Sequence, residues 1–329
     1  MRQIVLASIT AIVVAAVLIL AGPQRIALAS DVTGDKNLAA QLQDHSEPGF
    51  HQLTAFTIRD GATTFAGLGA DEHTEIEIGS VTKMFTGEIA HQLVEERVLS
   101  LDTTVGEVLD VGNAPVADVT MRELLDHTSG LPRLANTNLL SSIASGITGA
   151  NPYQGEKVED IMDAATKAEL KNRGEESYSN LGYALLGHLL ETAAGKPYEE
   201  LLKERIFQPA EMSDTYLMTP GSVPDDAPRG LHTTGRHAQP WEMEGSAPAG
   251  AIRSTASDMA KFASWFMDNG DATYGWQPNE EGAGFWHNGG TYGYSTMLII
   301  DPDKKRAAFA NNDSPTGTED LARALLDAL

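Results

Sequence analysis

Apolar residues recur along this chain with two different periods. Helical spacing is clearest at five positions in the first third, Val81, Met84, Phe85, Ile89 and Leu93. Residues three and four apart share one face of a helix. The pattern therefore predicts an amphipathic helix over Ser80–Arg97, with Ser80 in its first turn.

Strand patterns lie near both ends of the chain. Gln52–Ile58 and Ala62–Gly67 flank the turn Arg59-Asp60-Gly61, which is typical of a hairpin. Near the C-terminus, three further apolar stretches predict an antiparallel meander: Gly284–Asn288, Tyr294–Asp301 and Lys305–Asn311.

Residues 116–214 are mainly helical in pattern. The clearest helix there is Asn180–Ala194, because Gly195 and then Pro197 end it. Other expected helices are Asn37–Gln43, Met121–Asp126, Tyr198–Arg205, Ser257–Met267 and Glu319–Leu329.

The order of these elements predicts the fold class. Two strands from the start and three from the end can pair in one antiparallel sheet with helices on its faces. We expect an α/β fold of the α+β type: a sheet lobe from residues 48–115 and 215–329, and an inserted, mainly helical lobe from residues 116–214.

The N-terminus carries its own pattern. Arg2 precedes an unbroken apolar run from Ile4 to Ala21, and the small-x-small sequence Ala27-Leu28-Ala29 follows. Residues 1–29 therefore resemble an export signal cleaved before Ser30, with an uncleaved signal anchor as the alternative. Either reading places residues 30–329 outside the cytoplasm, secreted or tethered to the membrane.

Composition excludes several kinds of chemistry. The chain has no cysteine, which excludes disulfides, thiolate metal sites and a cysteine nucleophile. Its formal net charge is -23, so binding to a phosphate backbone is disfavoured. We expect no nucleic-acid partner, no metal and no cofactor.

The stretch EIGSVTKMFTG, residues 77–87, places Ser80 three residues before Lys83. Positions i and i+3 share a helix face, so Lys83 could remove the proton from the Ser80 hydroxyl. The start of the helix also offers backbone N–H groups to an oxyanion. By itself the pair is more typical of a helix cap and a solvated lysine than of a catalytic site.

Two later motifs supply partners for this chemistry. Tyr178 lies just before a helix, where a tyrosine near a lysine can pass a proton to a leaving group. Asn180 can hold the lysine and a substrate carbonyl. Taken alone, the two residues are better explained as a half-buried aromatic and a helix cap.

The third motif is His287-Asn288-Gly289-Gly290-Thr291, at the end of an expected strand. Glycines there allow a substrate to lie against the strand edge. The Gly290 N–H could be a second oxyanion donor, opposite the N–H of Ser80. Alone, the motif could also be a glycine-rich turn.

Together, in this order, the motifs resemble the serine β-lactamase and penicillin-binding family in its class C-like branch. That branch includes D-alanyl-D-alanine carboxypeptidases, D-aminopeptidases and esterases. The matching stretches, which span most of residues 48–312, are GSVTK (79–83), LLDHTSGLP (124–132), YSNLGY (178–183), STASDMAKF (254–262) and HNGGTYGY (287–294).

The resemblance implies a role for each residue. Ser80 would form the acyl-enzyme, and Lys83 would be its base or keep Tyr178 ionised. Tyr178 would protonate the leaving amine or activate the deacylating water, and Asn180 would orient the reactants. The backbone N–H groups of Ser80 and Gly290 would bind the oxyanion.

The substrate-positioning residues would be Asn180, His287, Gly289 and Thr291. His287 departs from the lysine that class C β-lactamases usually carry there, which favours a peptidase or esterase over an efficient β-lactamase. Arg253 and Arg236 are other candidate cations, although a surface role is favoured for both.

For the remaining histidines and motifs we expect structural roles. We expect His232 and His237 to be surface or packing residues, and Leu124–Pro132 to shape a turn without a part in the chemistry.

The sequence thus predicts a serine hydrolase that acts through an acyl-enzyme on D-amino-acid peptides or β-lactam amides. Its partners would be small-molecule or peptide substrates, such as cell-wall peptides, β-lactams or esters. The alternatives are an esterase and a non-catalytic binding protein with the same fold.

Overall fold

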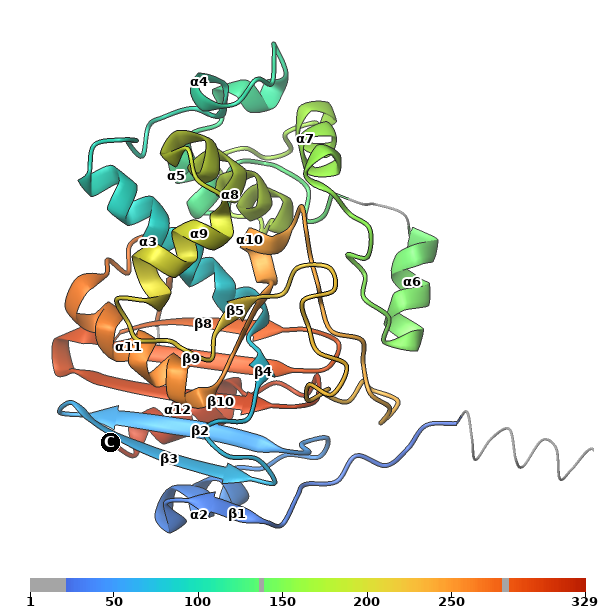
Figure 1. Ribbon diagram of the computed structural model, residues 1–329, viewed down its shortest axis with the longest axis vertical. Helices are drawn as coiled ribbons and strands as arrows, with labels where there is room; N and C mark the ends of the chain where they lie inside the picture. Colours follow the sequence, from blue (N-terminus) through green and yellow to red (C-terminus); the bar gives the residue numbers. More distant parts are fainter. Residues whose placement is uncertain (1–21, 136–138, 280–283) are drawn as a thin grey trace, which may run out of the picture.

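The computed structural model describes residues 22–135, 139–279 and 284–329. A seven-stranded antiparallel sheet forms one end of the molecule, and most of the helices stack above it (Figure 1). Its order is β1-β3-β2-β10-β9-β8-β7. The strands are β1 (Val32–Gly34), β2 (Leu53–Arg59), β3 (Ala62–Leu68), β7 (Gln277–Pro278), β8 (Phe285–Gly290), β9 (Ser295–Asp301) and β10 (Arg306–Asn312).

The predicted joining of the two ends of the chain in one sheet is confirmed. β2 pairs with β10 along its whole length, from Leu53 opposite Asn312 to Arg59 opposite Arg306. The edge strands β1 and β7 were not predicted from the pattern. With only three and two residues, they are too short to show a period.

Both faces of the sheet are covered, because successive side chains of a strand point to opposite sides. On β9, Leu298 and Ile300 join the main core, while Met297 and Ile299 join a smaller core under α2 (Lys36–Asp44) and α12 (Glu319–Asp327). β1 and α2 thus extend the sheet part of the chain to residues before 48.

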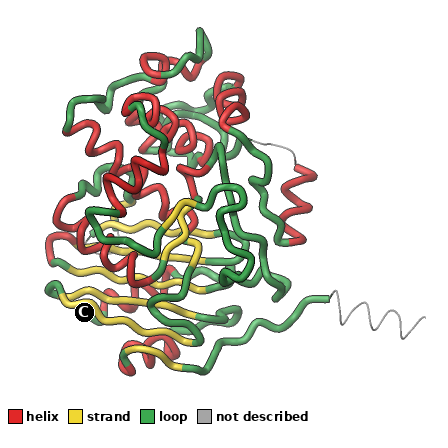
Figure 2. Tube along the Cα trace, in the orientation of Figure 1, coloured by secondary structure: helices red, strands yellow, loops and turns green. Residues whose placement is uncertain are grey.

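The other elements lie on the main-core side of the sheet, where Figure 2 shows the helices grouped. A small second sheet has the order β4-β6-β5, formed by β4 (Ile76–Glu77), β6 (Ile252–Ser254) and β5 (Tyr216–Leu217). The helices are α3 (Thr82–Glu95), α4 (Val105–Val108), α5 (Met121–Leu125), α6 (Leu139–Thr148), α7 (Val158–Lys167), α8 (Asn180–Ala194), α9 (Tyr198–Leu202), α10 (Ala247–Gly250) and α11 (Ala256–Asn269).

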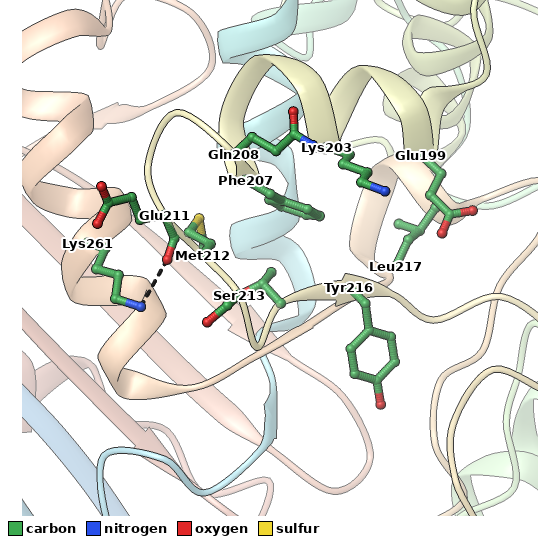
Figure 3. Close-up of a pocket in the computed structure, with 11 residues that line it drawn as sticks. Glu199, Lys203, Phe207, Gln208, Glu211, Met212, Ser213, Tyr216, Leu217 and Lys261 are labelled. Carbon is green, nitrogen blue, oxygen red and sulfur yellow. Dashed lines mark hydrogen bonds between the residues drawn. The ribbon is translucent and has the colours of Figure 1, made fainter.

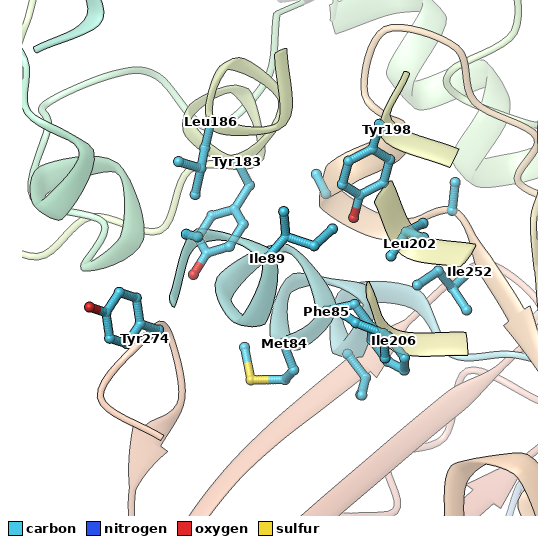
Figure 4. Packing of buried hydrophobic residues seen from close by; sticks show 14 of the residues in the cluster. Met84, Phe85, Ile89, Tyr183, Leu186, Tyr198, Leu202, Ile206, Ile252 and Tyr274 are labelled. Carbon is cyan, nitrogen blue, oxygen red and sulfur yellow. The ribbon is translucent and has the colours of Figure 1, made fainter. Parts of the chain in front are cut away.

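Helix α3 is the centre of the molecule, and its predicted amphipathic character is wrong. Every residue from Thr82 to Ala90 is buried, because α8, α9 and α10 enclose the faces that the sheet does not cover. Figure 4 shows Met84, Phe85 and Ile89 pointing to different sides of this core. A helix enclosed on all sides gives a rigid base to the residues at its start.

The predicted export signal falls mostly outside the described residues, which begin at Gly22. The described part of this segment lies along the folded domain: the Gln24 N–H donates to the carbonyl of Thr234, and the Ala29 N–H donates to that of His51. Across the described ranges, none of the helices combines the length and apolar character that a membrane crossing requires.

Candidate active site

Ser80 lies in a 3₁₀ turn, Gly79–Val81, that leads directly into α3. The turn is pressed against the end of β8. A Cβ at Gly79 would lie 2.7 Å from the backbone nitrogen of Gly290, and Gly79 has a φ of +50°. Glycine is therefore required there, and the close approach brings the backbones of Ser80 and Gly290, the two expected oxyanion donors, together.

Lys83 reaches Ser80 as the spacing predicted. Its Nζ donates to Ser80 Oγ at 3.0 Å and to the carbonyl oxygen of Ala249 at 2.6 Å. The side chain is fully buried. Burial, opposed by the attraction of Tyr178, holds the pKa of Lys83 below the usual value for lysine. A lowered pKa increases the fraction of Lys83 that is the neutral amine, which is the form that can act as a base.

Tyr178, which lies 98 residues further along the chain, is the third member of the cluster. Its hydroxyl donates to Ser80 Oγ at 2.7 Å. Two cations flank its ring: Lys83 Nζ at 4.9 Å and Arg133 Cζ at 5.0 Å from the ring centroid. The Tyr178 ring thus lies close to two cationic side chains as well as to Ser80.

The segment that carries Tyr178 is held by the stretch Leu124–Pro132. His127 has a φ of +57°, an uncommon conformation for a residue with a side chain. Its carbonyl accepts from the Ser177 N–H, its Nδ1 accepts from the Ser179 N–H at 3.1 Å, and its ring lies 4.4 Å from the Tyr178 ring. This stretch thus shapes more than a turn in the helical part, because it positions Tyr178.

Asn180 lies in the same site with part of its amide unused. Its Nδ2 donates to the Tyr153 hydroxyl at 3.2 Å, whereas its Oδ1 is buried and finds no partner among the described residues. A buried acceptor without a partner is costly. Lys83 Nζ bonds Ser80 and Ala249 and not Asn180, so the expected roles of the amide toward the lysine and the substrate stay predictions.

His287, at the centre of β8, is buried beside the cluster. Its Nδ1 donates to the carbonyl of Asn288 at 2.6 Å. Burial and the nearby Lys83 lower the pKa of His287 to about 3. The imidazole is therefore neutral near pH 7 and cannot supply the charge of the lysine that it replaces.

Gly289 and Thr291 have packing roles in this structure and do not line the cavity beside Ser80. Thr291 Oγ accepts from the N–H groups of Gly293 and Tyr294. Thr291 is also buried, and its expected contact with a substrate stays a prediction.

The packing role of Gly289 predicts a stability effect. A Cβ there would lie 2.0 Å from the carbonyl oxygen of Ile78, so Gly289→Ala should cost about 1–3 kcal/mol of unfolding free energy. At Gly290 the nearest atom would be 4.0 Å away. Gly290→Ala is therefore the matched control, with a smaller expected loss in thermal or urea unfolding; equal losses would contradict this packing.

A cavity of about 210 Å³ opens beside Ser80. Only three of the residues that line it were predicted as site residues from the sequence: Ser80, Asn180 and Gly290. The others are Gly79, Arg133, Leu134, Ser145, Pro152, Tyr153, Glu156, Trp241, Met243, Ala249, Gly250 and Tyr292. Arg133 could have been noted because it directly follows HTSGLP. Gly79 and Tyr292 lie within the quoted motifs, and Ser145, Ala249 and Gly250 lie on helices α6 and α10. The other lining residues come from loops without a motif.

A larger cavity, of about 720 Å³, lies elsewhere (Figure 3). It is formed by α9 and the turn after it, β5 and α11. Lys261 borders it and is already bonded to the carbonyl of Glu211 at 3.0 Å. None of Ser80, Lys83 and Tyr178 lines this cavity, so the smaller cavity is the candidate active site.

The two other candidate cations do not line the Ser80 cavity. Arg253 is fully buried, and its Nε bonds Glu75 at 2.7 Å; its expected surface role is wrong because it packs within the small sheet. Arg236 is partly buried and donates to the carbonyl of Gly22. His232 is buried and His237 exposed.

The structure also bears on metal binding. In residues 22–135, 139–279 and 284–329, no group of three or more His, Asp or Glu side chains could hold a metal ion. The polar side chains around Ser80 suit proton transfer, with one hydroxyl between an amine and a phenol.

An antiparallel sheet, a central helix and a serine between lysine and tyrosine define a serine hydrolase scaffold. The model of the family named Beta-lactamase matches residues 35–329, and the chain belongs to this family. The predicted resemblance and fold class are confirmed.

The chain is similar to penicillin-binding protein 4 of Amycolatopsis lactamdurans, with 28% identity over 68% of this chain and 58% of the relative. It is 29% identical to the D-alanyl-D-alanine-carboxypeptidase/endopeptidase AmpH of Escherichia coli over 59% of this chain and 49% of the relative. The chain thus matches about half to three fifths of the length of these relatives. Among solved structures, a D-amino acid amidase from Ochrobactrum anthropi shares the fold, with a TM-score of 0.74, 21% identity and coverage of 89% of this chain and 100% of that one.

Proposed function

We propose that this protein hydrolyses amide bonds of D-amino-acid peptides or β-lactams through an acyl-enzyme on Ser80. The observation that carries the proposal is the contact of Ser80 Oγ with both Lys83 Nζ and Tyr178 OH, at 3.0 and 2.7 Å. The names of the relatives, a penicillin-binding protein and a D-alanyl-D-alanine carboxypeptidase, support the substrate class.

In the proposed reaction, Ser80 Oγ attacks the amide carbonyl carbon while its proton passes to neutral Lys83 or to the Tyr178 phenolate. The N–H groups of Ser80 and Gly290 bind the resulting oxyanion. Tyr178 then protonates the leaving nitrogen as the C–N bond breaks. Water attacks the ester, and the same groups accept its proton and return one to Ser80.

The leaving group lies beside Tyr178 in this scheme, and Arg133 lies over the same ring. Arg133 is exposed and forms no ion pair within the described ranges. We propose that it binds the carboxylate of a leaving D-amino acid, in place of the missing lysine.

Replacing Arg133 with glutamine should therefore raise KM about tenfold for a D-alanyl-D-alanine peptide, because a hydrogen bond between charged groups is lost. KM for the corresponding C-terminal amide should change little. Arg173→Gln is the control, since Arg173 is paired with Glu123 and does not line the cavity. An equal rise for peptide and amide would argue against a carboxylate contact.

An esterase is a second candidate, favoured by the neutral state of His287. Steady-state hydrolysis of a D-alanyl peptide, its L-alanyl counterpart and the D-alanyl methyl ester decides between the two. Faster cleavage of the D-peptide than of the L-peptide supports the proposed function. Cleavage of the ester alone would support the esterase instead.

We further propose that the enzyme acts outside the cytoplasm, on the basis of the apolar run after Arg2 and the small-x-small sequence at residues 27–29. Fractionation of cells, with N-terminal sequencing of the mature protein, tests this and separates a cleaved signal from a retained anchor.

A further inference from the structure

One wall of the Ser80 cavity is aromatic and takes no part in the proposed acyl transfer. Tyr153, Trp241 and Tyr292 line it. The Tyr153 and Trp241 ring centroids are 5.3 Å apart at 66°, and those of Trp241 and Tyr292 are 5.2 Å apart at 83°. Rings packed edge to face leave π-faces that can receive a cation.

A carboxylate lies in the same wall. Glu156 is partly buried, and its carboxylate accepts a hydrogen bond from Ser246 Oγ. The backbone fixes it as well, since the Gly245 N–H donates to the Glu156 carbonyl and the Glu156 N–H donates to that of Tyr153. Within the part of the chain that the structure describes, no cationic side chain pairs with Glu156.

The unpaired charge needs an explanation, because burying a carboxylate without a cation is unfavourable. Burial raises the pKa of Glu156, and the nearby Asp160 raises it further. A cationic ligand would relieve this cost. Adjacent aromatic rings would add to the attraction, since a cation over such a face gains about 0.5–2 kcal/mol.

The cavity carries a positive side chain, Arg133, and a negative side chain, Glu156, at two different positions. Arg133 lies over Tyr178, on the side proposed for the leaving group, whereas Glu156 belongs to the aromatic wall with Tyr153. The cavity is small: at about 30 Å³ for each water, 210 Å³ holds roughly seven waters. A compact aminoacyl group suits it better than a long peptide. The net charge of -23 also favours the approach of cations.

We propose that Glu156 and Trp241, with Tyr153, bind the protonated α-amine of the residue that acylates Ser80. The preferred substrates would then be D-aminoacyl amides and short D-peptides with a free N-terminus. This inference rests on the proposed function and narrows its substrate class.

The test compares two substrates that differ only at the amine, D-alanine p-nitroanilide and N-acetyl-D-alanine p-nitroanilide. For the wild type we expect kcat/KM to be at least tenfold higher with the free amine. Glu156→Gln should remove most of this preference through KM and leave kcat/KM for the acetylated substrate within about twofold. The control is Glu159→Gln, an exposed carboxylate three residues away that does not line the cavity.

A second measurement needs no variant. Ethylammonium chloride should inhibit cleavage of the acetylated substrate by the wild type competitively, whereas sodium chloride at equal ionic strength should not. Equal rates for the two anilides in the wild type, an unchanged preference in Glu156→Gln, or no inhibition by ethylammonium would overturn the inference and leave the proposed function standing. Cleavage of neither anilide would count against the proposed function and this inference together.

Discussion

Replacing Ser80 with alanine should lower kcat/KM for every hydrolysable substrate by at least about 10⁴-fold, because the acyl-enzyme can no longer form. Ser80 Oγ is the atom that both Lys83 and Tyr178 contact, so no neighbouring hydroxyl has the same partners. The measurement is steady-state hydrolysis of a D-alanyl amide and an ester by the purified protein.

Ser177→Ala serves as the control for this variant. Ser177 is exposed, lies one residue before Tyr178 and does not line the cavity. Its activity should match the wild type. Turnover by Ser80→Ala within tenfold of the wild type would show that another group is the nucleophile.

Replacing Lys83 with methionine should lower kcat/KM by about 10³-fold, which is within the range for loss of a general base. Methionine fills the buried space without a charge, and the lysine makes no ion pair that would be broken. Retained folding can be checked by thermal unfolding, so the loss can be assigned to chemistry.

The pH profile gives the same prediction a second readout. The reactive form of Lys83 is the neutral amine, and burial lowers the pKa of Lys83 from its ordinary 10.5. In the wild type, kcat/KM should therefore rise with pH and level off above this lowered pKa. In Lys83→Met, this rise of kcat/KM with pH should be absent. A variant with the wild-type profile would show that another group titrates.

The sheet could be predicted well from the sequence, because its long strands have a strict register. Leu298 and Ile300 face one core and Met297 and Ile299 the other, so this strand, buried on both faces, is a continuous apolar run in the sequence. The short edge strands β1 and β7 carry no such signal. The burial of α3 depends on α8, α9 and α10, which lie far from it in the sequence, so its own pattern could not show it.

The reacting groups could also be predicted, whereas their surroundings could not. Ser80 and Lys83 are linked by helix geometry, and Tyr178 by a motif at a helix start. Arg133 and Glu156 enter the cavity only through the packing of loops. Thr291 lies in a recognisable motif, yet it is buried and its hydroxyl accepts from the N–H groups of Gly293 and Tyr294, which local sequence does not indicate.

The most direct test of the central claim is the intact mass of the purified domain incubated with benzylpenicillin, with Ser80→Ala alongside. The predicted result is an added mass equal to that of the whole penicillin on the wild type alone, since opening the ring loses no atoms. The adduct would be lasting if deacylation is slow, or brief and accompanied by loss of penicillin if it is fast. An equal adduct on Ser80→Ala would contradict an acyl-enzyme on Ser80. Neither adduct nor loss of penicillin with the wild type would contradict the β-lactam part of the proposed substrate class.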